Sequence, residues 1–230
     1  AILGAAQKVR EKLFALAAHA LEASASDLEL TPGSIHVRGV PTKKISIGEL
    51  ANLAYNEQQL PEGIEKGLEE NSKFDIQSAT SPFGAHLCVV EAHATTGEVE
   101  ILEYICVDDC GTVMNPLLVE GQVHGGIAQA IGQALYEQVL YDDYGQNISS
   151  SLMDYVLPKA HFLPSYQTHR MVTPSPTNPL GVKGVGEAGT IGGTPAVANA
   201  VIDALEPFGI KHLDMPFWPQ KLWQAINIKS

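Results

Sequence analysis

The stretch that decides the fold is AHLCVVEAHATTGEVEILEYICVDD, residues 85–109. Two runs rich in aliphatic and aromatic residues, 85–93 and 98–109, lie on either side of Ala94-Thr95-Thr96-Gly97. Runs of this kind around a short segment that contains glycine are typical of a β-hairpin. We therefore predict two long antiparallel strands joined by a tight turn. The acids that end the second strand, Asp108 and Asp109, are interpreted as structural rather than as metal ligands.

After the hairpin, residues 120–136 place apolar residues at helical spacing but are crowded with glycine. The four glycines of this segment are Gly121, Gly125, Gly126 and Gly132. Each costs a helix interior about 1 kcal/mol relative to alanine, so we expect the helix to pack closely against a neighbour. Asn115-Pro116, just before it, is interpreted as a turn.

Shorter patterns predict the remaining elements of this half. They are strands at 152–156 and 166–172, an irregular proline-rich segment at 173–181, a helix opened by Thr194-Pro195, and a last helix at 219–228. Met153 and Met171 are expected to fill the core.

The first part of the chain has its own pattern. It predicts an amphipathic helix over 5–22, two short strands within 27–39, a short helix over 46–56 and a long loop over 57–74. Ser46 and Glu49 have the spacing of a capping box, which predicts the start of the short helix.

Composition excludes several classes of protein. A chain of 230 residues can bury one sizeable core or two small ones, and 45% apolar with 17% charged residues is ordinary for a folded domain. The net charge of -12 argues against a general nucleic-acid or anionic-membrane binder. The three cysteines form no CxxC and no zinc or iron–sulfur spacing, so any electron-carrying clusters are expected on another chain. The start, AILGAAQKVREKL, has no initiator methionine, which suggests a fragment or one piece of a larger assembly.

The glycine-rich run LGVKGVGEAGTIGGTP, residues 180–195, carries a single acid, Glu187. Within it, residues 184–189 spell G-x-G-x-x-G, the dinucleotide-binding fingerprint. That motif requires a strand before it and a helix that starts inside it. Because prolines precede the run and the next helix is expected only at Thr194, we disfavour a dinucleotide site.

Two other interpretations of the run are a flexible linker and a cradle for a ligand. A flexible linker is disfavoured because Val182, Val185 and Ile191 interrupt it and prolines brace it. Alternatively, successive glycine amides form a concave cradle that presents Glu187 as a general base, with Lys183 available to a phosphate-bearing ligand.

PLGVKGVGEAG, together with VDDCGTVMNPLLVEGQVHGGIAQAIGQALYE (107–137), resembles the C-terminal molybdenum-cofactor-binding region of the xanthine dehydrogenase/aldehyde oxidase family. The chain looks most like the large-subunit branch that includes aerobic carbon monoxide dehydrogenases. The resemblance implies an α+β fold, the C-terminal portion of the family's molybdopterin-binding domain, with mixed strands and packed helices. It also implies that residues 1–78 end the first cofactor-binding subdomain and that 79–230 form the C-terminal one.

The resemblance also implies roles for particular residues. Glu187 matches the glutamate that acts as a base beside molybdenum, and Gln122 matches a glutamine that hydrogen-bonds the pterin. Lys183, Gly184, Val185 and Gly186 fall where the family's chain passes the cofactor. Gly121, Gly125 and Gly126 are expected to let their helix approach the pterin. The family's metal is held by its cofactor, which agrees with the absence of a Cys/His ligand cluster.

For the whole protein, the resemblance implies a molybdenum–molybdopterin cofactor, in the plain or the cytosine dinucleotide form. Partners would be the N-terminal part of the large subunit, an iron–sulfur small subunit and an FAD medium subunit, assembled as a dimer of heterotrimers. The substrate would be carbon monoxide, an aldehyde or an N-heterocycle, in a cytoplasmic enzyme that can associate with the membrane through its partners. Two alternatives are a non-catalytic scaffold or fragment and a phosphate or nucleotide binder that uses the glycine-rich loop.

Overall fold

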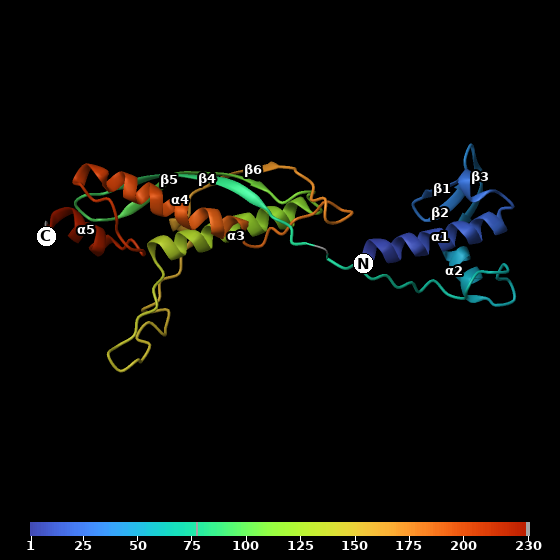
Figure 1. The fold of residues 1–230 in the computed structure, drawn as a ribbon, viewed down its shortest axis with the longest axis horizontal. Coiled ribbons are helices and arrows are strands. Elements are labelled where there is room, and N and C mark those ends of the chain that lie inside the picture. The colour runs from blue at the N-terminus through green and yellow to red at the C-terminus, as the bar shows by residue number, and fades with distance from the viewer. Residues whose placement is uncertain (77, 229–230) are drawn as a thin grey trace. The chain divides into compact units, whose positions relative to one another are not determined.

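The chain forms two compact units in the computed structural model, Ala1–Asp75 and Ile76–Ser230 (Figure 1). The structure describes residues 1–76 and 78–228. The division lies near the boundary between residues 78 and 79 expected from the sequence. The assignment of the two parts to cofactor-binding subdomains stays a prediction.

In the N-terminal unit, one face of a helix packs against a small sheet and a second helix. Its elements are α1 (Ile2–Ala20), the 3₁₀ turn η1 (Ala25–Asp27), β1 (Leu28–Thr31), β2 (Ser34–Val37), β3 (Val40–Ser46) and α2 (Ile47–Tyr55). The strands are antiparallel in the order β1-β2-β3. The capping box is confirmed, because Ser46 Oγ accepts from Glu49 N at 3.2 Å while the Glu49 carboxylate accepts from Ser46 N at 2.9 Å. The sequence patterns missed β3, whose side chains are mostly exposed.

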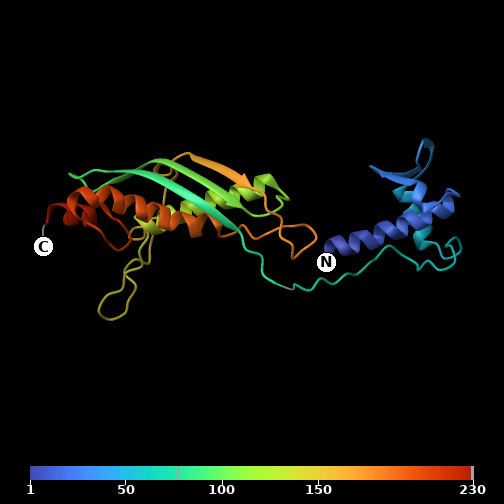
Figure 2. The ribbon, with the colours of Figure 1, turned by 45° about the horizontal axis from the view of Figure 1, so that its top comes forward.

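The C-terminal unit is a three-stranded sheet with two helices packed on one face (Figure 2). Its elements are β4 (Phe83–Ala92), β5 (Val99–Asp109), α3 (Pro116–Leu135), η2 (Ala160–Phe162), β6 (Tyr166–Met171), α4 (Ala188–Leu205), η3 (Glu206–Phe208) and α5 (Pro219–Asn227). The predicted hairpin is confirmed as the antiparallel pair β4–β5, and β6 adds to β5 in parallel. The core lies between sheet and helices, and its largest members include Tyr104, Ile127, Ile131, Val197, Val201 and Leu205. The α+β class predicted from the sequence is therefore confirmed.

One of the four helix glycines explains how α3 and α4 come together. A Cβ added to Gly126 would lie 2.9 Å from Gly189 Cα and 2.9 Å from Thr190 N, so the two main chains touch at this crossing. Gly132 packs instead against the side chains of Glu137 and Pro158, outside α4. A Cβ on Gly121 or Gly125 would meet no described atom within 4 Å. Close packing is thus confirmed at Gly126 and Gly132, whereas Gly121 and Gly125 face open space.

Several predictions about elements are wrong. Helix α3 begins at Pro116, with Asn115 as its N-cap and Asn115 Oδ1 accepting from Leu118 N at 3.2 Å, so Asn115-Pro116 is a helix start rather than an isolated turn. Helix α4 begins at Ala188 and contains Pro195, rather than beginning there. Packing of Gly189 and Gly193 against α3 stabilises the helix in a stretch whose glycines suggested a loop.

Two further expectations also fail. Residues 152–156 form turns instead of a strand. Met153 and Met171 are 90% and 53% exposed, so neither fills the core.

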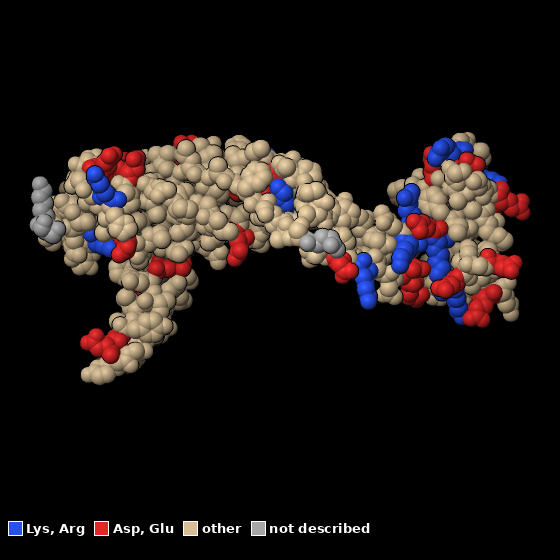
Figure 3. All heavy atoms as spheres, in the orientation of Figure 1, with Lys and Arg blue, Asp and Glu red and all other residues tan. Residues whose placement is uncertain are grey.

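Surface composition differs between the units. On the face in Figure 3, charged side chains crowd the N-terminal unit, whereas large areas of the C-terminal unit carry none. On the strands, Leu87, Val89 and Leu102 are 53%, 40% and 54% exposed. Exposed apolar surface of this extent is typical of sites that contact other protein segments. Within residues 1–76 and 78–228, no helix has the length and apolarity needed to cross a membrane.

Candidate functional site

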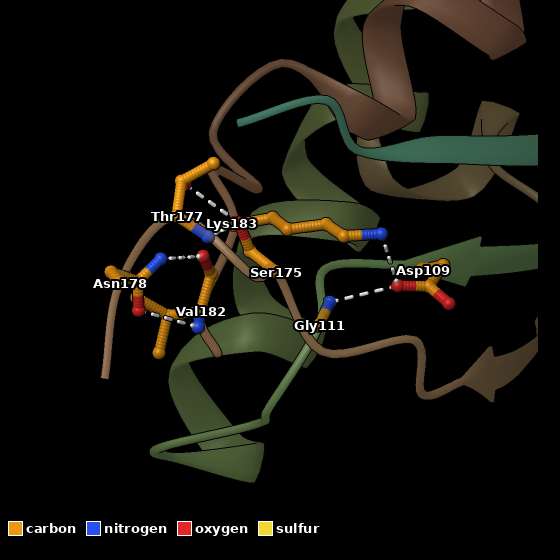
Figure 4. A network of polar contacts seen from close by, with 7 residues as sticks. All are labelled: Asp109, Gly111, Ser175, Thr177, Asn178, Val182 and Lys183. Carbon is orange, nitrogen blue, oxygen red and sulfur yellow. Dashed lines mark hydrogen bonds and ion pairs between the residues drawn. The ribbon is translucent and has the colours of Figure 1, made fainter. Parts of the chain in front are cut away.

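The glycine-rich run lies against the end of β5. Val182 forms a β-bridge with Gly111, Lys183 N donates to Cys110 O at 2.8 Å, and Thr112 N donates to Gly181 O at 3.0 Å. The Asn178 side chain closes the loop from the other side, donating to Val182 O at 2.9 Å and accepting from Val182 N at 3.1 Å (Figure 4). These hydrogen bonds tie residues 181–183 to the end of β5 and to Asn178. A flexible linker would not be held in this way.

Lys183 is anchored inside the protein. Its ammonium donates to Asp109 Oδ1 at 3.1 Å (Figure 4). It also lies 4.7 Å from the centre of the Phe83 ring. The two charged side chains are only 7% and 0% exposed. Burial alone would raise the pKa of Asp109, but hydrogen bonds from Thr173, Gly111 and Lys183 lower it to about 2. The ammonium that was expected to meet a phosphate is therefore already paired with a carboxylate.

Glu187 occupies the junction between this loop and α4. It is the N-cap residue, and its carbonyl accepts from Thr190 N at 3.1 Å and from Ile191 N at 3.0 Å. Its carboxylate is exposed and caps no amide of the described helix. The described chain therefore leaves this acid in contact with solvent. The N-terminus of a helix carries partial positive charge, so the junction is favourable for an anionic group.

Gln122 lies beside this junction although 65 positions separate it from Glu187 in the sequence. A Cβ added to Gly186 would lie 3.7 Å from Gln122 Nε2, so the two motifs meet in space. Gln122, Gly184 and Gly186 are exposed, whereas Val185 packs against the core and fixes the main chain between the glycines. Since no described atom lies near a Cβ on Gly121, Gly125 or Gly184, this surface leaves main chain accessible to a bound group. The structure thus places Gln122 next to the segment 184–187, whereas the Lys183 side chain turns inward to Asp109.

The sequence patterns did not identify a second group of buried polar residues next to this site. His86 Nδ1 lies 2.8 Å from Tyr104 Oη, and His86 Nε2 lies 3.3 Å from Asp108 Oδ1. The His86 ring also packs under α4, because a Cβ on Gly192 would lie 2.4 Å from His86 Cδ2. A cavity of about 100 Å³ lies beside this contact and is lined by Phe83, His86, Asp108, Ala188, Ile191 and Gly192, with Pro82 and Gly84. The alternation of β4 and β5 placed His86 and Asp108 on strands, but nothing in it indicated that they pair.

The ligand-type atoms of His86, Cys106 and Asp108 lie within 4.8 Å of one another. Burial, reinforced by Asp108, raises the pKa of the Cys106 thiol to about 12, so the thiol is protonated at neutral pH. His86 already uses both ring nitrogens in hydrogen bonds, and we therefore interpret the group as a buried polar network.

His124, in the same motif as Gln122, points towards the core. Its ring contacts the Tyr166 ring edge-on at 5.3 Å between centroids. His124 Nε2 is buried without a hydrogen-bond partner in the described chain. This placement favours a packing role over ligand contact.

The dinucleotide interpretation needs one correction. Helix α4 begins inside the G-x-G-x-x-G stretch, so the objection based on a helix start at Thr194 was wrong. The other objection holds, because β6 ends at Met171 and no regular strand leads into the described loop. A fingerprint without its strand lacks the geometry of the nucleotide-binding fold.

Comparison with known proteins identifies the chain. A family model described as "Molybdopterin cofactor-binding domain" matches residues 1–164, which include Gln122 but not Glu187. The carbon monoxide dehydrogenase large chain of Hydrogenophaga pseudoflava is 39% identical over 227 residues, covering 99% of this chain and 28% of that protein. The nicotine 6-hydroxylase large subunit of Paenarthrobacter nicotinovorans is 39% identical over 222 residues, covering 96% and 27%. The chain thus spans less than a third of the length of these relatives.

Solved structures agree with the sequence comparison. A Cu,Mo-CO dehydrogenase matches with a TM-score of 0.85 and 38% identity, over 97% of this chain and 28% of the other. Quinoline 2-oxidoreductase from Pseudomonas putida 86 matches with a TM-score of 0.87 and 38% identity, over 98% and 29%. The chain therefore belongs to the xanthine dehydrogenase/aldehyde oxidase family, in the molybdopterin cofactor-binding part of the large subunit.

Proposed function

We propose that this chain supplies one side of the molybdenum-cofactor site in the large subunit of an oxidoreductase, with Glu187 as the general base. The observation that carries the proposal is the meeting of two distant motifs. Gln122 on α3 lies against Gly186, one residue before Glu187 at the start of α4. Gln122, Gly186 and Glu187 are all exposed in the C-terminal unit.

The residues present fit a pterin-bound metal. Gln122 would hydrogen-bond the pterin through its exposed amide, and Lys183, Gly184, Val185 and Gly186 would line it with their main chain. The accessible main chain at Gly121, Gly125 and Gly184 allows a flat, polar group to approach closely. When bound, the molybdenum cofactor supplies the two-electron oxidation chemistry of this family and holds its own metal.

The role of Glu187 follows from its position and residue type. Its exposed carboxylate is free to accept a proton at an Oε atom from a hydroxyl presented across the loop. The N-terminus of α4 beside it favours negative charge, so an anionic group and the ionised carboxylate are both tolerated there. Segments outside this chain would exclude water from the acid in the assembled subunit.

The substrate would be carbon monoxide, an aldehyde or an N-heterocycle, oxidised with oxygen derived from water. Electrons would leave through an iron–sulfur small subunit and an FAD medium subunit, in a dimer of heterotrimers. The N-terminal part of the large subunit would complete the site. The cofactor would be molybdopterin in its plain or cytosine dinucleotide form. A cytoplasmic location, with membrane association through partners, belongs to the same proposal.

Metal analysis of the native complex tests the proposal against a non-catalytic scaffold. We expect stoichiometric molybdenum in the complex, with the pterin released on denaturation. Absence of molybdenum after expression with adequate cofactor supply would favour the scaffold. Binding of a nucleotide to the complex without molybdenum would favour the phosphate-binding alternative, which the pairing of Lys183 with Asp109 already weakens.

A further inference from the structure

Two adjacent acids at the end of β5 connect to opposite sides of the Glu187 turn, Asp109 directly through Lys183 and Asp108 indirectly through His86 of β4. Successive side chains of a strand point to opposite faces, so Asp108 and Asp109 diverge. Asp108 reaches His86, and Asp109 reaches Lys183. All four side chains are at most 8% exposed.

The Asp109 contact fixes the chain that enters the turn. Lys183 lies four residues before Glu187, and its ammonium is held by Asp109 Oδ1 and by the Phe83 ring. Asp109 Oδ1 also accepts from Gly111 N at 2.8 Å, which ties the carboxylate to its own strand end. Removing one partner of a buried ion pair leaves an uncompensated charge, so this contact is costly to break.

The Asp108 contact fixes the helix that leaves the turn. Asp108 and Tyr104 hold both nitrogens of His86, so the ring cannot easily rotate. The ring lies directly under Gly192, where α4 has no side chain to keep it away. The start of α4 therefore rests on a ring whose orientation the strands determine.

The Glu187 carboxylate has no cap bond of its own in the described chain, so its main chain must place it. We propose that Asp108 and Asp109 are positioning residues that set the Glu187 turn from its two sides, Asp109 through Lys183 and Asp108 through His86. The inference rests on the proposed function only where it concerns turnover. Precise placement matters there, because a displacement of about 1 Å can cost roughly 10²-fold in rate.

Hydrogen exchange measured by mass spectrometry tests the placement without any cofactor. The variants are Lys183→Met, which removes the ammonium at similar volume, and His86→Ala, which removes the ring under α4. We expect amides within 180–192 to exchange faster by on the order of 10²- to 10³-fold in Lys183→Met, with little change in the β4–β5 hairpin. Lys66→Met is the matched control, because its partner Glu57 lies 2.7 Å away in an exposed pair of the other unit. It should leave 180–192 unchanged.

Unchanged exchange in 180–192 in both variants would overturn the inference. So would equal acceleration throughout 78–228, since the contacts would then be ordinary core. Should Lys183→Met fail to fold, Asp109→Asn keeps the shape and the acceptor for Gly111 while removing the charge.

In the assembled enzyme, Lys183→Met should lower kcat per bound molybdenum by on the order of 10- to 100-fold with KM retained. Faster exchange with unchanged kcat would also overturn the inference. Substitution of Glu187 tests the proposed function separately, because it leaves both acid contacts in place.

Discussion

Alanine substitutions at two adjacent glycines of α3 should change stability in opposite directions. At Gly126 the new methyl group would lie 2.9 Å from Gly189 Cα and Thr190 N, closer than van der Waals contact permits. Both obstructing atoms belong to main chain, so the helices must separate. Overpacking of this kind costs about 1–3 kcal/mol, whereas the gain in helix propensity from glycine to alanine is about 1 kcal/mol. We therefore expect Gly126→Ala to lower the free energy of unfolding by up to about 2 kcal/mol.

Gly125→Ala is the matched control, since it makes the same substitution one position away in the same helix. A Cβ there would meet no described atom within 4 Å, so only the propensity gain of about 1 kcal/mol remains. Urea denaturation of the 230-residue chain, followed by circular dichroism, measures both changes. If Gly126→Ala stabilised the chain as much as Gly125→Ala, the crossing of α3 and α4 at these glycines would be refuted. The juxtaposition of Gln122 with Gly186 would lose its structural basis as well.

Three other predictions concern cofactor binding, pH and thiol reactivity. Gln122→Ala should weaken cofactor retention by roughly 1 kcal/mol or more, read from molybdenum content after dialysis, and full retention would contradict its role. The pKa of Asp109 is lowered from 3.8 to about 2, so its stabilising effect should be complete above about pH 4 and lost as pH falls towards 2. Asp109→Asn should abolish this part of the pH dependence of the free energy of unfolding. An unaltered pH dependence in that variant would refute the assignment. Cys106, with a pKa of about 12, should react with a thiol reagent at pH 8 only after unfolding, and rapid labelling of the folded chain would contradict its buried environment.

The sequence was most informative where local pattern and tertiary packing agree. Alternating strands around a short turn predicted the β4–β5 hairpin, and Ser46 with Glu49 predicted the start of α2. The start of α4 was missed for the opposite reason. Its glycines are unfavourable in an isolated helix, and their benefit appears only when Gly189 and Gly193 lie against α3. Local propensity carries no information about that contact.

The candidate site shows the same limit. Motif resemblance selected Gln122 and Glu187, and the structure places their segments side by side. The motif resemblance gave no indication that Asp109 neutralises Lys183, or that His86 lies between Asp108 and Tyr104. These pairs join residues on different elements of the fold. These pairs are distinguished from ordinary surface contacts by their burial and not by their spacing in the sequence. Buried polar pairs of this kind require the fold before they can be recognised.

The most direct test of the central claim is the turnover of a Glu187→Gln variant in the assembled enzyme. Glutamine preserves the size of the side chain but cannot accept the proton, so we expect turnover to fall by on the order of 10²- to 10⁴-fold while molybdenum content and thermal stability stay unchanged. Glu206→Gln, at the opposite end of α4, is the control and should turn over normally. Turnover of Glu187→Gln at the wild-type rate would contradict the assignment of this carboxylate as the base.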